Sequence, residues 1–545
     1  MSSFTPYERI IVLALDSVCW ELLQPYAADA TMPTLAALMK TSSYGVLEST
    51  VPPHTAAAWT TFLTGKDPGH HGIIDFVGFD PAAHRFKFHT SAASRADSIL
   101  SRLSGSEISC GSIFLPRCYP PYPLHEGYMI SGFETPNVDS PFSEPKELKD
   151  EVLGLSPQMH FNFEDDWEED KDDPAFARNI ERAMNAVDLL ERLAVHFQRE
   201  RPVRLQIAYL QATDILFHKA WRWCDPKTSA ENPFRAEQIR KFFRRVDQLI
   251  NRVLGVHSSS STSGRFRAGG AQDKTLRVIV SDHGHGSSNG RVFINNLLKD
   301  WGYLAPLSGL KRASRRLRLL TTFDAEERRV KSRELPLDWS RTKAYLAHVG
   351  IYGFVYLNLK GREPNGIVSS GEFEKLRDEL IAKFKAAKIP GTDQPLFIDA
   401  FKGEKIYARK KELNLPDIVL APADGYYPRK KLSRGPAVRV TPKSIGGVHR
   451  SQGVYLFQGA GIAAGGAPAQ SANIADMAPT LLAALGEAVP TTMTGKVMSH
   501  VFQQAPKVEK VKDDKSTAPA ESESAYTKEE EQAIEKRLAD LGYLE

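Results

Sequence analysis

Short apolar runs alternate with longer amphipathic stretches along most of this chain. Ile10 to Leu15 is continuously apolar, which is typical of a strand buried on both faces of a parallel sheet. Similar strand-like runs lie at 204–210, 276–280, 417–421 and 454–457, and apolar residues recur with helical spacing at 179–198 and 237–253. This alternation predicts an α/β fold, a doubly wound and mostly parallel sheet with helices on both faces.

Two stretches interrupt the alternation. Residues 79–170 are rich in Pro, Gly and aromatic side chains, and residues 300–404 include a basic run from Lys311 to Arg318. We interpret both stretches as cap insertions into one domain that covers residues 1–505. Residues 506–526 are charged and poor in apolar side chains, which predicts a disordered linker.

Residues 527–545 regain a helical pattern. Thr527 and Glu530 have the spacing of a capping box at the start of a helix. The apolar residues that share one face of this predicted helix are Ile534, Leu538 and Leu541. We expect this face to dock on the body of the protein or on a second subunit, so a homo-oligomer stays open.

The composition narrows the class of protein. Hydrophobic residues make up 42% and charged residues 25% of the 545 positions, which is ordinary for a soluble globular chain. The formal net charge of +4 gives no reason to expect nucleic-acid binding. The apolar run at the start is too short to span a membrane and lacks the flanks of a signal peptide. The four cysteines have neither metal-ligand nor disulfide spacing. We therefore expect a cytoplasmic protein without a transmembrane segment.

Three aspartates follow three of the strand-like runs. Asp16 follows the first run, Asp214 lies just beyond 204–210, and Asp282 lies just beyond 276–280. Loops at the carboxyl ends of parallel strands converge on one crevice. We therefore expect the three carboxylates to meet at one rim of the sheet.

Histidines accompany these aspartates. His218 stands one helical turn after Asp214, His283 directly follows Asp282, and His449 lies in a glycine-bounded turn. Six such ligands divide naturally into two sites of three. Carboxylate with imidazole is typical of zinc, although manganese and iron accept the same ligands.

The stretch PPHTAAAW, beginning at Pro52, ends an extended segment and starts a helix at an alanine-rich run. Thr55 then has two interpretations. It is only an N-cap, or it is a nucleophile at the helix N-terminus, where free N–H groups favour an anion. A free threonine hydroxyl is a poor nucleophile, and metal coordination would lower its pKa.

The chain resembles the alkaline phosphatase superfamily, in particular the type I phosphodiesterase/nucleotide pyrophosphatase branch and related phosphohydrolase/phosphomutase proteins. The motifs that carry the resemblance are LALDS at 13–17, PPHTAAAWTTFLTGKDPGHHGI at 52–73, QATDILFHKAW at 211–221, VSDHGHG at 280–286 and GVHRSQGVY at 447–455. The resemblance extends from about Arg9 to about Met498.

The resemblance implies an alkaline-phosphatase-like fold and a phosphoric-ester hydrolase that acts on a small phosphate ester through a phosphothreonine at Thr55. It also implies two divalent ions, with zinc the first expectation. One ion would be held by Asp214, His218 and His449, and the other by Asp16, Asp282, His283 and the oxygen of Thr55.

One position departs from the family pattern. Ala58 stands where nucleotide pyrophosphatases usually carry an asparagine that donates to phosphate, and His54, Lys66 and Arg450 are candidate substitutes. The chain also lacks the motif that sulfatases need, which disfavours sulfate esters. A phosphomonoesterase or phosphomutase of the same superfamily and a non-catalytic metal-binding scaffold remain as alternatives.

Overall fold

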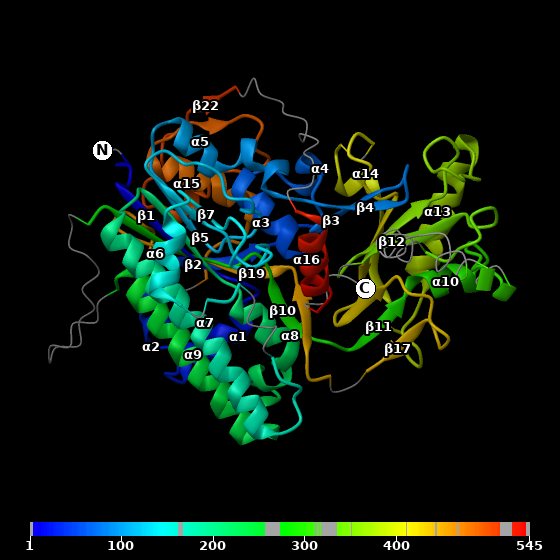
Figure 1. Ribbon diagram of the computed structural model, residues 1–545, viewed down its shortest axis with the longest axis horizontal. Helices are drawn as coiled ribbons and strands as arrows, with labels where there is room; N and C mark the ends of the chain where they lie inside the picture. Colours follow the sequence, from blue (N-terminus) through cyan, green and yellow to red (C-terminus); the bar gives the residue numbers. More distant parts are fainter. Residues whose placement is uncertain are drawn as a thin grey trace. The chain divides into compact units, whose positions relative to one another are not determined.

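The structure is a computed structural model of the whole chain, shown in Figure 1. The residues that it describes are 4–157, 159–161, 167–256, 273–310, 313–314, 317, 335–349, 351–409, 411–441, 444–465, 468–512 and 526–540. Most of the basic run 311–318 and residues 513–525 of the predicted linker lie outside the described residues.

The chain divides into two compact units. The first unit comprises Met1–Ile74, His89–Ser287 and Ile445–Gly542. The second unit is built around Asp75–Phe88 and Ser288–Ser444. The predicted insertion at 300–404 falls within the second unit, whereas most of the stretch 79–170 belongs to the first.

Within the described residues, nine strands of the first unit form the main sheet in the order β20-β2-β19-β9-β1-β8-β5-β6-β7. In that order the strands are β20 (Ala472–Asn473), β2 (Ser43–Glu48), β19 (Gln452–Gln458), β9 (Thr275–Val280), β1 (Arg9–Leu15), β8 (Leu205–Leu210), β5 (Cys110–Ile113), β6 (Tyr128–Ile130) and β7 (Ser143–Glu144). The pairs β9–β1, β1–β8, β8–β5, β5–β6 and β2–β20 are parallel. This arrangement confirms the predicted α/β fold class.

Strand β1 explains why helices cover both faces of this sheet. Its side chains from Ile10 to Leu15 are all buried, so neither face of the strand meets water. Ile11, Leu13 and Leu15 belong to the core formed with α7 (Asp173–Glu200) and α9 (Pro233–Leu254). The alternating side chains point to the opposite face, which α3 (Thr55–Thr64) and α15 (Met477–Leu485) cover. Figure 1 shows the two helix layers on either side of the strands.

The first unit contains further α-helices among its described residues. They are α1 (Trp20–Ala28), α2 (Pro33–Thr41), α4 (Pro68–His71), α5 (Ile99–Gly105), α6 (Leu148–Leu155), α8 (Ala212–Cys224) and α16 (Lys528–Asp540). None of the described helices has both the length and the apolar character needed to cross a bilayer.

Two of the predicted strands pair differently from a parallel sheet. The run 454–457 lies in β19, which is antiparallel to both β2 and β9. The run 417–421 lies in β15 (Ile418–Pro422), which belongs to an antiparallel sheet of the second unit. Apolar runs of this length indicate a buried strand, but they do not indicate which strand it pairs with or in which direction.

The second unit contains two small sheets and a hairpin among its described residues. One sheet has the order β12 (Ala344–Val349), β13 (Gly353–Leu357), β15 and β14 (Phe397–Lys402). The other has the order β16 (Tyr426–Arg429), β11 (Gly290–Phe293) and β17 (Val438–Val440). The hairpin is β3 (Val77–Asp80) with β4 (Arg85–Phe88), and the helices are α10 (Ile294–Asp300), α13 (Ser370–Ala386) and α14 (Gly403–Ile406).

The C-terminal helix α16 docks on the first unit. Its capping box forms, since the Thr527 N–H donates to the Glu530 carboxylate at 2.9 Å and the Glu530 N–H donates to Thr527 Oγ1 at 3.2 Å. Arg537 donates to the backbone carbonyls of Phe133 and Thr135 at 2.5 and 2.7 Å. The helix is therefore held by hydrogen bonds to a loop that follows β6.

Candidate metal centre

The three predicted aspartates lie at the ends of three adjacent strands. In the main sheet β1 lies between β8 and β9, with Leu15 opposite Leu210 and Ala14 opposite Val280. The strand ends are therefore level. Asp16 directly follows β1, Asp282 lies just beyond the end of β9, and Asp214 lies in the first turn of α8, which follows β8. All three side chains are fully buried.

Two short antiparallel strands add histidines to this rim. The ladder of β10 (Gly284–Ser287) and β18 (Gly447–Arg450) places His285 directly opposite His449. A glycine is required at position 284, because a Cβ there would lie 2.2 Å from the Gln452 carbonyl oxygen. His285 was not predicted. Its spacing of two from His283 is the signal in the sequence, because residues two apart on a strand share a face.

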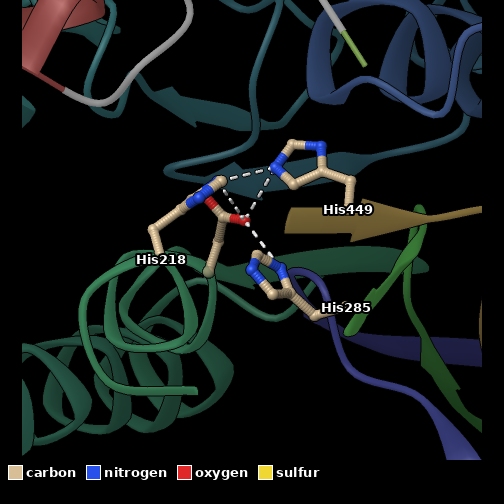
Figure 2. A group of neighbouring side chains, drawn as sticks. His218, His285 and His449 are labelled. Atoms are coloured by element: carbon tan, nitrogen blue, oxygen red, sulfur yellow. Dashed lines mark hydrogen bonds and ion pairs between the residues drawn. The ribbon is translucent and has the colours of Figure 1, made fainter. Parts of the chain in front are cut away.

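A first group of ligand atoms surrounds Asp214. Asp214 Oδ1 lies 3.2 Å from His449 Nε2, 3.5 Å from His218 Nε2 and 3.8 Å from His285 Nδ1. Figure 2 shows the three imidazoles pointing toward one another, and His218 Nε2 lies 2.8 Å from His449 Nε2. One ligand atom from each of the four residues lies within 4.8 Å of the other three. The structure thus brings together Asp214, His218 and His449 and adds His285.

A second group surrounds His283. Its Nε2 lies 3.2 Å from Asp282 Oδ2 and 3.7 Å from Asp16 Oδ1. The atoms that all lie within 4.8 Å of one another come from Asp16, His283 and Asp214. Asp214 therefore lies between the two groups, and Asp282 contacts the second group through His283.

Two carboxylates of this cluster, those of Asp16 and Asp282, are only partly compensated by protein donors. Burial raises the pKa of Asp16 well above its usual range, and the neighbouring carboxylates of Asp282 and Asp214 raise it further. Burial also raises the pKa of Asp282 to about 7. Asp16 Oδ1 and Asp282 Oδ2 have no hydrogen-bond donor among the described residues. Buried carboxylates in this state are costly unless a cation balances them, so the donor set fits divalent metal ions.

Three of the histidines, His218, His283 and His285, are suited to metal binding because burial keeps them neutral. Burial lowers the pKa of His218 to about 4, and it lowers the pKa values of His283 and His285 well below their ordinary value. A neutral imidazole has a nitrogen lone pair available to a metal ion.

Thr55 is the first residue of α3 and is fully buried. Its Oγ1 lies 3.2 Å from His283 Nε2, so its hydroxyl reaches the second group. The N-cap of α3 is His54, whose Nδ1 accepts a hydrogen bond from the Ala56 N–H at 3.2 Å. Capping of α3 therefore falls to His54 and not to Thr55.

The candidate substitutes for the missing asparagine have other partners. His54 caps α3, and Lys66 pairs with Asp97 at 2.8 Å. Arg450 donates to the Ser287 and His449 carbonyls at 2.7 and 3.0 Å. Ala58 is buried within α3.

A cavity of about 580 Å³ lies in the first unit, and its described lining contains neither Thr55 nor a candidate ligand. Its lining includes Phe114, Phe133, Arg182, Arg192 and the run from Tyr209 to Ala212. The Tyr209 hydroxyl donates to Asp16, and the residues after Ala212 lead into Asp214. The cavity wall and the candidate ligands are therefore parts of the same strand-to-helix connection.

Comparison with known proteins gives a family match. The family profile described as type I phosphodiesterase/nucleotide pyrophosphatase matches residues 10–451. No sequence among the functionally curated proteins matches the chain significantly.

Several solved structures resemble this one. Human ectonucleotide pyrophosphatase/phosphodiesterase 5 matches with a TM-score of 0.50 at 13% identity, over 91% of this chain and 98% of that one. The murine protein of the same name matches with a TM-score of 0.48 at 13% identity, over 91% and 99%. Phosphonoacetate hydrolase from Sinorhizobium meliloti 1021, in complex with phosphonoformate, gives 0.49 at 13% identity, over 84% and 94%. The human match shows a shared fold.

Proposed function

Because the chain belongs to the type I phosphodiesterase/nucleotide pyrophosphatase family, we propose that it hydrolyses phosphoric diesters at a two-metal centre with Thr55 as the nucleophile. The observation that carries the proposal is the position of the Thr55 hydroxyl, 3.2 Å from His283 Nε2 in a buried cluster of aspartates and histidines. This family consists of phosphohydrolases, and the chain retains a complete set of candidate ligands.

The proposed ligand sets divide the cluster in two. Asp214, His218 and His449 would hold one ion, and Asp16, Asp282, His283 and Thr55 the other. We propose zinc for both sites, since carboxylate and imidazole suit it, and manganese or iron as the other candidates. When bound, the ions supply Lewis-acid charge that lowers the pKa of a hydroxyl and stabilises negative charge near phosphorus.

The chain's own groups would bind and attack the substrate. The N-terminus of α3 favours a phosphoryl anion through its backbone N–H groups and its dipole. Thr55 Oγ1 loses its proton to solvent and forms the bond to phosphorus, while the bond from phosphorus to the leaving group breaks and the departing oxygen takes up a proton from solvent. Water then cleaves the phosphothreonine, which restores the threonine hydroxyl and releases a phosphomonoester.

We propose that the leaving group of a diester occupies the cavity whose lining includes Tyr209, the residue that donates to Asp16. At about 580 Å³ it is within the usual size range of ligand pockets and far exceeds the volume of a single phosphoryl group. Its lining combines aromatic rings with Arg182 and Arg192, so it would accept a leaving group with both apolar and anionic parts.

The test compares Thr55→Ala with Thr55→Ser. Metal-depleted protein is reconstituted with Zn²⁺ or Mn²⁺ and assayed on bis-p-nitrophenyl phosphate and p-nitrophenyl phosphate. We expect turnover of the diester by wild type, a loss of at least about a thousandfold in Thr55→Ala, and substantial retention in Thr55→Ser. Circular dichroism of the variants should match wild type, and each variant is assayed at saturating metal because Thr55→Ala lacks one proposed ligand.

The alternatives give different results in the same assay. Faster turnover of the monoester would favour a phosphomonoesterase or phosphomutase. Bound metal without turnover of either compound would favour a non-catalytic metal-binding protein. Undiminished diester turnover by Thr55→Ala would rule out Thr55 as the nucleophile.

A further inference from the structure

Ser17, which directly follows Asp16, has an unfavourable backbone conformation. Its φ is 69°, in the left-handed region that residues with a Cβ rarely adopt. The residue is fully buried. Glycine would adopt this φ without strain, so the backbone alone gives no reason for a serine at this position.

The side chain of Ser17 lies between both groups of candidate ligands. Its Oγ lies 2.8 Å from Asp214 Oδ1, 2.8 Å from His285 Nδ1 and 3.1 Å from His283 Nδ1. Its backbone N–H donates to Asp282 Oδ1 at 3.3 Å. One residue therefore contacts four ligand candidates from two separate segments of the chain, Asp214 and the run from Asp282 to His285.

The single hydroxyl proton fixes the direction of these hydrogen bonds. Asp214 is a carboxylate and can only accept, so Ser17 donates its proton to Asp214 Oδ1. The lone pairs of Ser17 Oγ then accept from imidazole N–H groups, which requires a proton on His285 Nδ1 and is consistent with one on His283 Nδ1. Each ring then has its metal-binding lone pair on Nε2. The Gly284 carbonyl, 3.2 Å from His283 Nδ1, favours the same tautomer.

This tautomer directs the useful lone pair of His283. With the proton on Nδ1, the lone pair is on Nε2, the atom that lies 3.2 Å from both Thr55 Oγ1 and Asp282 Oδ2. Hydrogen bonds to the other ring nitrogen commonly orient metal-binding histidines and set their tautomer.

We propose that Ser17 is a positioning residue that orients Asp214, His283 and His285 for metal binding, and that this role accounts for a serine in a left-handed conformation. The proposal rests on the metal centre of the proposed function. Ser17 contacts neither substrate nor reacting atoms in this scheme and acts through the ligands that it holds.

Two substitutions separate the hydroxyl from the backbone strain. Ser17→Ala removes the hydroxyl and keeps the strain, whereas Ser17→Gly removes both. We expect metal-depleted Ser17→Gly to melt at a higher temperature than Ser17→Ala. We expect both variants to bind Zn²⁺ about 10–100-fold more weakly than wild type, measured by competition with a chromogenic chelator. The visible spectrum of the Co²⁺-loaded protein should change in both.

Ala30→Gly is the matched control. Ala30 also has a positive φ, of 62°, but lies between α1 and α2, away from the ligands. This substitution should raise the melting temperature of the metal-depleted protein and leave the affinity for Zn²⁺ unchanged.

The outcomes separate this inference from the proposed function. If wild type takes up no metal ion, the proposed function fails and the inference with it. If wild type binds zinc and Ser17→Gly binds it equally well, the inference alone is overturned. If Ser17→Ala binds Zn²⁺ weakly and Ser17→Gly recovers the affinity, the effect comes from the backbone and not from the hydroxyl. That result also overturns the inference.

Discussion

Asp417 in the second unit and Asp282 in the first are both completely buried carboxylates, and their surroundings differ. Arg362 forms two hydrogen bonds to Asp417, at 2.9 and 2.6 Å, and two more to Glu363, at 3.0 and 2.8 Å. The backbone N–H groups of Leu357 and Leu359 donate to the same two acids at 2.8 and 2.7 Å. We call this set the arginine cluster.

The candidate metal centre has no such compensation. Asp282 and Asp16 contact His283, which burial keeps neutral, and each has one oxygen without a hydrogen-bond donor among the described residues. Burial raises the pKa of Glu363 too, but Arg362 opposes that rise.

The difference separates a structural role from a binding role. Buried acids that are paired with an internal arginine need no further partner. Buried acids that face neutral histidines and one another are neutralised either by a proton or by a cation from solution. The predictions below test this distinction, beginning with the largest expected effect.

Asp282→Asn should have the largest effect on the metal centre. Removing one carboxylate should lower metal content and reduce diester turnover by about a thousandfold, since the ions contribute several kcal/mol to the transition state. The metal-depleted variant should melt no lower than metal-depleted wild type, because a costly buried charge is gone. Elemental analysis, turnover and thermal melting measure these three effects.

Asp273→Asn is the control for that variant. Asp273 pairs with Arg277 at 2.7 Å near the start of β9, far from the strand end that carries Asp282. Metal content should not change. Full metal occupancy in Asp282→Asn would contradict the proposed ligand set.

Arg362→Met should have the opposite effects, a loss of stability without a loss of metal. It leaves Asp417 and Glu363 buried without their cation, so the free energy of unfolding should fall by about 3–5 kcal/mol. Metal content of the folded protein should stay the same. Urea unfolding measures the loss, and adding Asp417→Asn and Glu363→Gln to the variant should restore part of it. An unchanged unfolding midpoint in Arg362→Met would remove the distinction between the two clusters.

The pH dependence of stability should show a smaller effect. The pKa of Asp282 is raised to about 7 in the folded protein from an ordinary value of 3.8. Its protonated form therefore favours the folded state, and this contribution is present below about pH 4 and lost as pH rises to about 7. Metal-depleted wild type should lose stability relative to Asp282→Asn over that interval. A difference in melting temperature that stays flat from pH 4 to 8 would refute this expectation.

The sequence was sufficient to predict the strand ends of the centre. The continuous apolar run of β1 and the acids after β1, β8 and β9 identify buried parallel strands and their shared rim. The prediction that Thr55 is the nucleophile came from the resemblance to a family. The structure brings Asp16, Asp214, Asp282 and the predicted histidines into one cluster, and the division into two metal sites stays a prediction.

Other features depend on information that local pattern does not contain. The partner of β15 is set by pairing with β13 and β14, which are distant in the sequence. His285 was missed because only one histidine of the SDHGHG motif was assigned as a ligand. Ser17 was missed because a left-handed φ at a serine has no signature in composition or periodicity.

The position of β19 in the sheet bears on when the proposed metal centre would be complete during synthesis. β19 lies between β2 and β9, and His449 precedes it directly in β18. At 5–20 residues per second, a ribosome needs roughly 20 to 90 s to proceed from Asp16 to His449. During that time the nascent chain lacks one ligand and the strand that joins two parts of its sheet. Selection of a metal ion by the proposed centre would therefore follow synthesis, and the ions available to the completed chain would decide which one it receives.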